Sequence, residues 1–94
     1  MDPQAPGVPP PEFIFTFATT RDAIEGEKAL IAGGMSPGVM PLPDQIGAGC
    51  GICLRVGPAE LEKARAVLGA GFQALYAAGT AGAGGKKVFT LWNP

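Results

Sequence analysis

The chain contains two cysteines, Cys50 and Cys53, which lie three positions apart in the stretch GAGCGICLRV. A C-x-x-C pair can form a disulfide, supply half of a zinc site, carry a transferable group on a reactive thiol, or pack in a core. Gly49 and Gly51 flank Cys50, so little bulk surrounds its sulfur, and successive backbone N–H groups can point at an anion there. We therefore expect Cys50 to be an exposed, reactive thiol in a loop.

Cys53 belongs to an expected strand over residues 52–56, in which side chains alternate between the two faces of a sheet. The aliphatic residues of this strand should face the helices, which places Cys53 and Arg55 together on the opposite, more open face. A guanidinium close to a thiol favours the thiolate, so Arg55 could stabilise a charged sulfur. Cysteine is also among the most buried residue types, and Cys53 could equally be a small core residue.

Other roles for the two cysteines stay open at the level of sequence. A structural zinc site needs four ligands, and two thiols without histidine would require carboxylates or a second subunit. A thioredoxin-type redox site gains thiol acidity from a helix that follows the motif, whereas here a strand follows. Met35 and Met40 precede the motif and could add soft ligands for Cu(I), although methionines at such positions are more often core residues.

The residue inventory excludes several classes of chemistry. The chain has no histidine, so neither a Cys–His nor a Ser–His dyad can form, and triad-type hydrolysis has no support. The glycine-rich stretches GAGCG and GAGG lack the lysine–serine/threonine pair of a P-loop and the spacing of a dinucleotide-binding turn. The formal net charge of −1 provides no electrostatic attraction to nucleic acid or to an anionic membrane.

Length and composition predict one small globular domain, because the 94 residues are 47% hydrophobic and 16% charged. The start of the chain, MDPQAPGVPPPE, carries an aspartate where a secretory signal would carry basic residues, and no apolar run follows. No stretch approaches the roughly 20 apolar residues that span a bilayer. We therefore expect a cytoplasmic protein, whose thiols are kept reduced.

Three strands are expected besides the one that holds Cys53. Residues 12–18 alternate two largely apolar sets, which is typical of a central strand buried on both faces. Residues 36–42 contain two prolines, so this short strand should lie at a sheet edge. Residues 72–77 form the last of these strands. Residues 1–11 hold five prolines and should be a flexible lead-in.

Two helices are expected between these strands. The first covers residues 19–34, where Thr19 can act as the N-cap. Gly26 lies inside this helix and costs up to about 1 kcal/mol relative to alanine. The second covers residues 58–71 and begins with Pro58, a residue favoured in the first helical turn.

The order strand–helix–strand–strand–helix–strand predicts an α+β protein with a ferredoxin-like βαββαβ sandwich over residues 12–78. Its antiparallel sheet would have four strands, with both helices on one face. Residues 79–94 are expected to be a Gly/Ala linker followed by an apolar tail. The stretch VFTLW within this tail could add a further strand or dock on a partner, including a second copy of the chain.

Three stretches, FIFTFATTRDAIEGEKAL, GVMPLP and CGICLRV, resemble a family of small bacterial proteins described as selenium/sulfur carrier-like. The likeness covers about residues 12–78. In that family a proline-bounded loop leads to a Cys-Gly pair and then to a short apolar strand. The resemblance implies that Cys50 carries sulfur or selenium as a persulfide-type adduct. The chain departs from the pattern at Asp44, where a basic residue is expected, at Cys53, where a small apolar residue is common, and in its longer tail.

The leading interpretation is therefore a cytoplasmic carrier that holds sulfur or selenium on Cys50 and hands it to a partner enzyme. Cys53 would act as the resolving thiol, Arg55 would favour the charged sulfur, and the N–H groups of Gly49 and Gly51 would surround it. We expect donor and acceptor proteins as partners, a homodimer as one open assembly, and neither a cofactor nor a resident metal. Such a transfer protein would not be an enzyme. The alternative is a protein-interaction or regulatory module in which the cysteines are passive.

Overall fold

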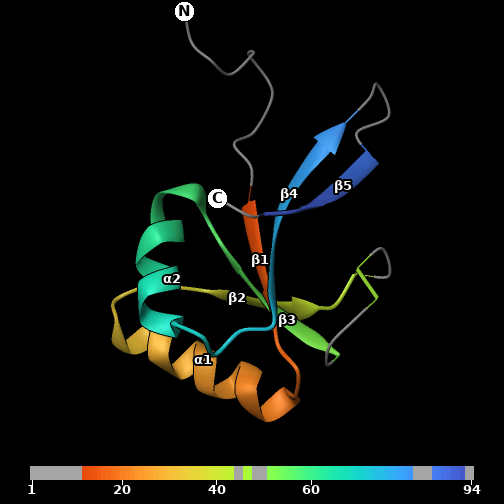
Figure 1. Ribbon diagram of the computed structural model, residues 1–94. Coiled ribbons are helices and arrows are strands. Elements are labelled where there is room, and N and C mark those ends of the chain that lie inside the picture. The colour runs from red at the N-terminus through yellow and green to blue at the C-terminus, as the bar shows by residue number, and fades with distance from the viewer. Residues whose placement is uncertain (1–11, 44–45, 48–50, 82–85, 93–94) are drawn as a thin grey trace, which may run out of the picture.

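The computed structural model describes residues 12–43, 46–47, 51–81 and 86–92 of the chain. Within them the fold is α+β, with two α-helices and a five-stranded antiparallel sheet (Figure 1). In chain order the elements are β1 (Glu12–Thr16), α1 (Thr20–Ala32), β2 (Gly38–Pro41), β3 (Ile52–Val56), the 3-10 turn η1 (Pro58–Glu60), α2 (Leu61–Leu68), β4 (Ala74–Ala81) and β5 (Lys86–Leu91).

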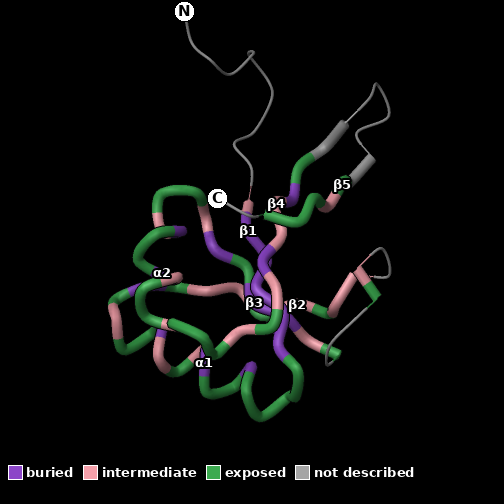
Figure 2. Tube along the Cα trace, in the orientation of Figure 1, coloured by how far each residue is buried: buried purple, intermediate pink, exposed green. Residues whose placement is uncertain are grey.

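Strand β1 is central, as its apolar pattern predicts. The strands are ordered β2-β3-β1-β4-β5, so β1 pairs with β3 on one side and with β4 on the other. Phe13, Ile14, Phe15 and Thr16 are all buried, which means that side chains on both faces of this strand are shielded from water (Figure 2). The same order confirms that β2, which ends in Pro41, lies at a sheet edge.

Both helices lie on the same side of the sheet (Figure 1). Helix α1 begins after Thr19, whose hydroxyl oxygen accepts a hydrogen bond from the backbone N–H of Asp22 at 3.0 Å, as the capping pattern predicts. Gly33 is its C-cap. The main core forms between this helix layer and the sheet; it contains Phe13, Phe15, Phe17, Ala23, Leu30, Met35, Leu54, Val56, Leu61, Ala64 and Leu75.

A second, smaller cluster lies on the sheet face that the helices do not cover. Its buried members are Ile14, Cys53 and Ala78. The partly buried side chains that pack against it are Met40, Leu42, Ile46, Tyr76 and Phe89. This face is therefore not an open surface at its centre, because larger neighbours shield the three buried residues.

The C-terminal part of the sheet extends the expected four-stranded sandwich, and the structure confirms that VFTLW adds a further strand. β4 continues to Ala81 and pairs with β5, so the sheet gains a fifth strand and residue 78 lies inside β4 rather than at its end. The sequence from residue 78 resembles a linker because its side chains are small and show no regular spacing of apolar residues. In the fold, Ala78 is buried beside Ile14, a place on the sheet where a small side chain suffices.

In the part of the chain that the structure describes, no helix has both the length and the apolar character that a membrane span requires.

Candidate functional site

The connection between β2 and β3 leads into the cysteine pair. Leu42 donates its backbone N–H to the carbonyl oxygen of Gly51 at 3.0 Å, which extends the β2–β3 pairing by one step. A tight turn follows, because the carbonyl oxygen of Pro43 accepts from the N–H groups of Ile46 at 3.0 Å and Gly47 at 3.3 Å. This hairpin connection holds Gly51 beside Leu42 at the start of β3.

The residues around the first cysteine are only partly described. Gly51 is exposed, and among the described residues beyond its chain neighbours no atom lies within 4 Å of a Cβ atom added to it. Gly49 and Cys50 lie outside the described residues. The exposed Cys50 thiol and its surrounding N–H groups therefore stay predictions.

Cys53 is fully buried on the sheet face away from the helices. Its Sγ atom donates weakly to two carbonyl oxygens of the neighbouring strand, Met40 O at 3.7 Å and Pro41 O at 3.8 Å. The alternation along β3 is as predicted, since Leu54 and Val56 belong to the core under the helices. The expectation that Cys53 lies on an open face is wrong, because the β2–β3 connection folds back onto that face.

The surroundings of Cys53 enclose its thiol. Its Sγ atom faces the carbonyl oxygens of Met40 and Pro41, and apolar side chains cover it. The cover comes partly from Leu42 and Ile46, which pack against the cluster that contains Cys53. Sequence reasoning missed these two residues as part of the site. The available signal was the presence of two large apolar side chains in an otherwise proline- and glycine-rich loop.

Arg55 follows Cys53 on the same face but is exposed. Its Nε atom lies 3.9 Å from Oε2 of Glu12 on β1, and both side chains are more than two-fifths exposed. A Cβ atom added to Gly38 would lie 2.8 Å from Nη2 of Arg55, so the guanidinium extends over this glycine of β2. The structure thus brings Arg55 together with Glu12 and Gly38; its role beside a thiolate stays a prediction.

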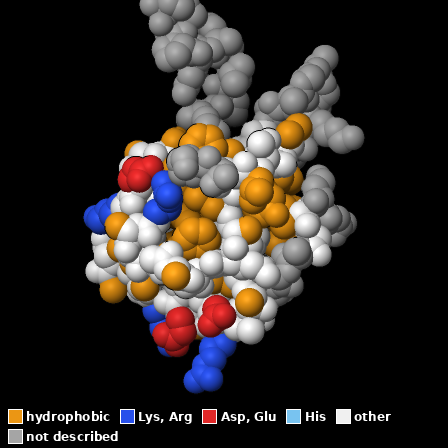
Figure 3. Space-filling view, viewed as in Figure 1, with side chains coloured by type: hydrophobic (Ala, Val, Ile, Leu, Met, Phe, Trp, Pro, Cys, Tyr) orange, Lys and Arg blue, Asp and Glu red, His pale blue; other side chains and the backbone are white. Residues whose placement is uncertain are grey.

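Two pockets lie on the helix side of the molecule. The larger has a volume of about 380 Å³ and is lined by Arg65, Phe72, Gln73, Ala74, Leu75, Leu91 and Trp92. The backbone N–H of Trp92 donates to the carbonyl oxygen of Leu75 at 2.8 Å. Its ring makes an edge contact with the ring of Phe13, with 5.2 Å between the centroids. Apolar side chains gather on this side of the molecule (Figure 3).

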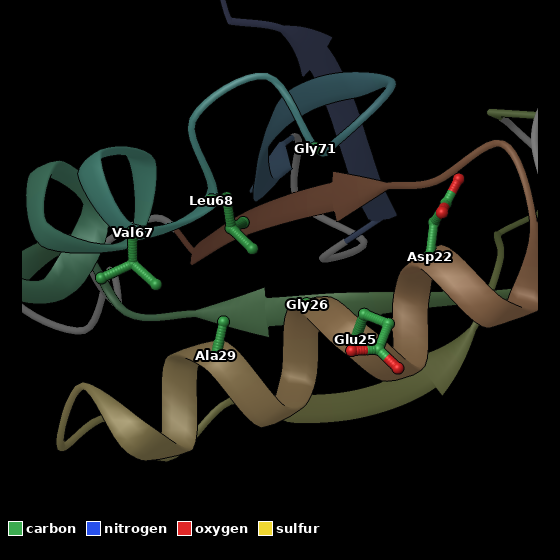
Figure 4. Close-up of a pocket in the computed structure, with 7 residues that line it drawn as sticks. All are labelled: Asp22, Glu25, Gly26, Ala29, Val67, Leu68 and Gly71. Atoms are coloured by element: carbon green, nitrogen blue, oxygen red, sulfur yellow. The ribbon is translucent and has the colours of Figure 1, made fainter.

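The smaller pocket, of about 190 Å³, is a groove between α1 and α2 (Figure 4). The carboxylates of Asp22 and Glu25 lie toward one end of it, and Val67 and Leu68 of α2 lie along it. Neither pocket contains Cys53, which is on the opposite face of the sheet. Among the described residues there is also no group of three or more cysteine, aspartate or glutamate side chains placed to hold a metal ion.

Comparison with known proteins identifies one family. The model of a family described as "Putative Se/S carrier protein-like" matches residues 12–76, which run from the first residue of β1 into β4. No curated protein and no solved structure matches the chain. Since the matched region covers more than half of the chain, this protein belongs to the selenium/sulfur carrier-like family.

Proposed function

We propose that this protein carries sulfur or selenium on Cys50, as a persulfide or selenosulfide, and passes it to a partner enzyme. The observation that carries this proposal is the burial of Cys53, whose thiol faces two carbonyl oxygens under an apolar cover. Of the two thiols, only Cys50 therefore has a sequence setting that suits direct contact with a donor. The family supports the same assignment, and the scaffold would be a ferredoxin-like sandwich extended by β5.

Loading requires no net oxidation if the donor is itself a persulfide. The Cys50 thiolate attacks the terminal sulfur of the donor, a new S–S bond forms on Cys50, and the donor leaves as a thiolate. An acceptor thiolate can remove the terminal sulfur in the same way. An accessible thiolate is the form that undergoes reversible persulfidation.

The proposed resolving role of Cys53 is a second release route. Its sulfur would attack Sγ of Cys50, form a Cys50–Cys53 disulfide and release hydrosulfide, with the thiol proton leaving alongside. A dithiol reductant would then restore both thiols. This route first requires that the cover over Cys53 open, because Sγ of Cys53 is fully buried. Release to an acceptor thiol should therefore be faster than release through Cys53.

Intact-mass analysis tests the assignment. The reduced protein is exposed anaerobically to a small-molecule persulfide or to its selenium analogue, and Cys50→Ser is compared with the matched variant Cys53→Ser. We expect the parent and Cys53→Ser to gain the mass of one sulfur or selenium atom, and Cys50→Ser to gain none. Equal loading of Cys50→Ser and the parent would overturn the proposal.

The second candidate is a protein-interaction module with passive cysteines. It is favoured by the packing of Cys53 as an ordinary small core residue in one cluster with Ile14 and Ala78. The two candidates predict different reactivity for the other thiol. Rapid alkylation of Cys50 in the native protein supports the carrier, whereas protection of Cys50 until unfolding supports the module.

A further inference from the structure

The two edges of the sheet are built differently. At one edge, β2 has only four residues and ends in Pro41, which has no N–H to donate. Short length and proline are two devices by which proteins prevent pairing at a sheet edge. At the other edge, β5 has six residues, Lys86–Leu91, and no proline. Its two lysines, which can also discourage edge pairing, stand at its first two positions, so the stretch from Val88 to Leu91 carries no charge.

Among the described strands, β5 pairs only with β4, and its other edge presents a regular row of backbone groups. Trp92 lies opposite Leu75 by continuation of the β4–β5 register and donates its N–H to Leu75. In an antiparallel ladder, alternate residues point their N–H and C=O groups to the same neighbour. Thr90 and Val88 therefore also face β4, and the N–H and C=O groups of Lys87, Phe89 and Leu91 point away from the sheet.

Apolar side chains gather at the same edge. Val88 is 41% exposed, Leu91 is 61% exposed and Trp92 is 39% exposed, all within five residues of one another. An exposed apolar edge strand with outward N–H and C=O groups is a template for pairing with another strand. The remaining question is which strand it pairs with.

We propose that β5 pairs antiparallel with β5 of a second copy of this chain, about a two-fold axis at Phe89. The three outward residues are spaced evenly around Phe89, so Phe89 lies opposite its own copy and Lys87 opposite Leu91 of the partner copy. About six backbone hydrogen bonds then form between the copies. This register places no lysine directly opposite a lysine. Such a pair of like charges would destabilise the contact between the strands.

The charge of the whole chain supports a second copy as the occupant. With a formal net charge of −1, two copies repel each other only weakly. The paired strands would form one ten-stranded sheet, with the helices of both copies on the same face. Because one strand pair buries less than a standard interface, the dimer is weak and its population depends on concentration.

The inference goes beyond the proposed carrier function and does not depend on it. β5 is separated from β3 by β1 and β4, so pairing at this edge leaves the β2–β3 connection at the far side of the sheet. A variant that prevents pairing should therefore load sulfur on Cys50 as the parent does. Failure of one proposal then leaves the other testable.

Sedimentation velocity over a wide concentration range, at low ionic strength, tests the pairing. The parent should shift from the mass of one chain toward that of two. Leu91→Pro removes an outward N–H and leaves the bonds of Thr90 and Trp92 to β4, so this variant should stay monomeric with an unchanged circular dichroism spectrum. Val39→Ala, at the opposite edge, is the matched control and should associate as the parent does. A parent that is monomeric throughout, including one that pairs only with another protein, overturns the proposal.

A charge pair tests the register. Leu91→Lys and Leu91→Glu remove the same apolar side chain but place opposite charges across from Lys87 of the partner copy. In the dimer, residue 91 faces Lys87 of the partner copy at both ends of the strand pair, so Leu91→Lys adds two repulsive pairs and Leu91→Glu adds two attractive pairs. We therefore expect Leu91→Lys to weaken association about tenfold more than Leu91→Glu. Equal weakening by the two variants would contradict this antiparallel arrangement.

Discussion

At the scale of single residues, the surroundings of Cys53 decide what its thiol can react with. Cys53 is buried between β1, β2 and the β2–β3 connection, and its thiol donates to carbonyl oxygens of β2. Reaction at its sulfur must therefore begin with local opening, whose free energy sets the observed rate. Arg55, two positions later, lies over Gly38 and beside Glu12 at the surface.

Ile46→Ala should increase the alkylation rate of Cys53. Ile46 packs against the cluster that contains Cys53, so its truncation removes apolar contact that is present only in the closed state. A loss of about 1–2 kcal/mol for a half-buried aliphatic residue raises the opening equilibrium about tenfold. The measurement is native-state alkylation in a Cys50→Ser background, followed by mass spectrometry.

Val39→Ala is the control for that measurement, because Val39 is exposed and lies outside this cluster. It should leave the alkylation rate of Cys53 within a factor of about two. If Ile46→Ala and Val39→Ala have the same rate, the β2–β3 connection does not control access to Cys53.

At the scale of elements, the buried Gly26 of α1 lies close to the side chains of Phe17 and of Leu68 on α2. A Cβ atom added to Gly26 would lie 2.9 Å from two ring atoms of Phe17 and 3.2 Å from Cδ2 of Leu68. Phe17 is fully buried and cannot move aside without disturbing the core. A residue that is unfavourable by helix propensity is thus required by the contact between the helix and the residues around it.

Gly26→Ala should destabilise the protein. Helix propensity contributes up to about 1 kcal/mol in favour of alanine. Overpacking against Phe17 typically costs about 1–3 kcal/mol and should exceed that gain. The free energy of unfolding, measured by urea titration, should therefore fall.

Gly57→Ala is the matched control, since a Cβ atom added there would meet nothing within 4 Å and its backbone φ of −78° suits alanine. Its free energy of unfolding should be unchanged or up to about 1 kcal/mol higher. A Gly26→Ala variant as stable as this control would show that the helix layer can shift to accept the methyl group.

At the scale of the whole molecule, the fold extends beyond the region that the family model matches. The match ends at residue 76, within β4, whereas β4 continues to Ala81 and β5 completes the sheet. Phe89 of β5 packs against the cluster of Ile14, Cys53 and Ala78, and Trp92 contacts Phe13. The C-terminal hairpin is therefore an integrated part of both cores.

Phe89→Ala should lower the free energy of unfolding by about 1–3 kcal/mol, because it removes a half-buried aromatic ring from the second cluster. Leu91→Ala, which changes a side chain that is 61% exposed, should have an effect within about 0.5 kcal/mol. Thermal or urea unfolding at a concentration low enough to avoid association measures both. Equal stability of Phe89→Ala and the parent would mean that β5 adds little to the folded state.

Local features of the sequence were sufficient to predict most elements. The cap at Thr19, the prolines in β2 and the apolar alternation of residues 52–56 act over a few residues, and the structure confirms all three. The family resemblance in residues 12–78 also agrees with the matched family model. Around the site, the sequence identified the sheet face of Cys53 and left open whether it is buried; the structure shows that it is.

The sequence by itself determined where the helices and the first three strands lie, and which family the chain resembles. These depend on short-range patterns and on short motifs within the chain. Only the tertiary structure decided that Leu42 and Ile46 pack against the cluster around Cys53, that α1 needs Gly26, and that β5 forms the outer strand next to β4. Each of these depends on contacts between residues far apart in the chain, and small or loop residues carry no periodic signal of such contacts.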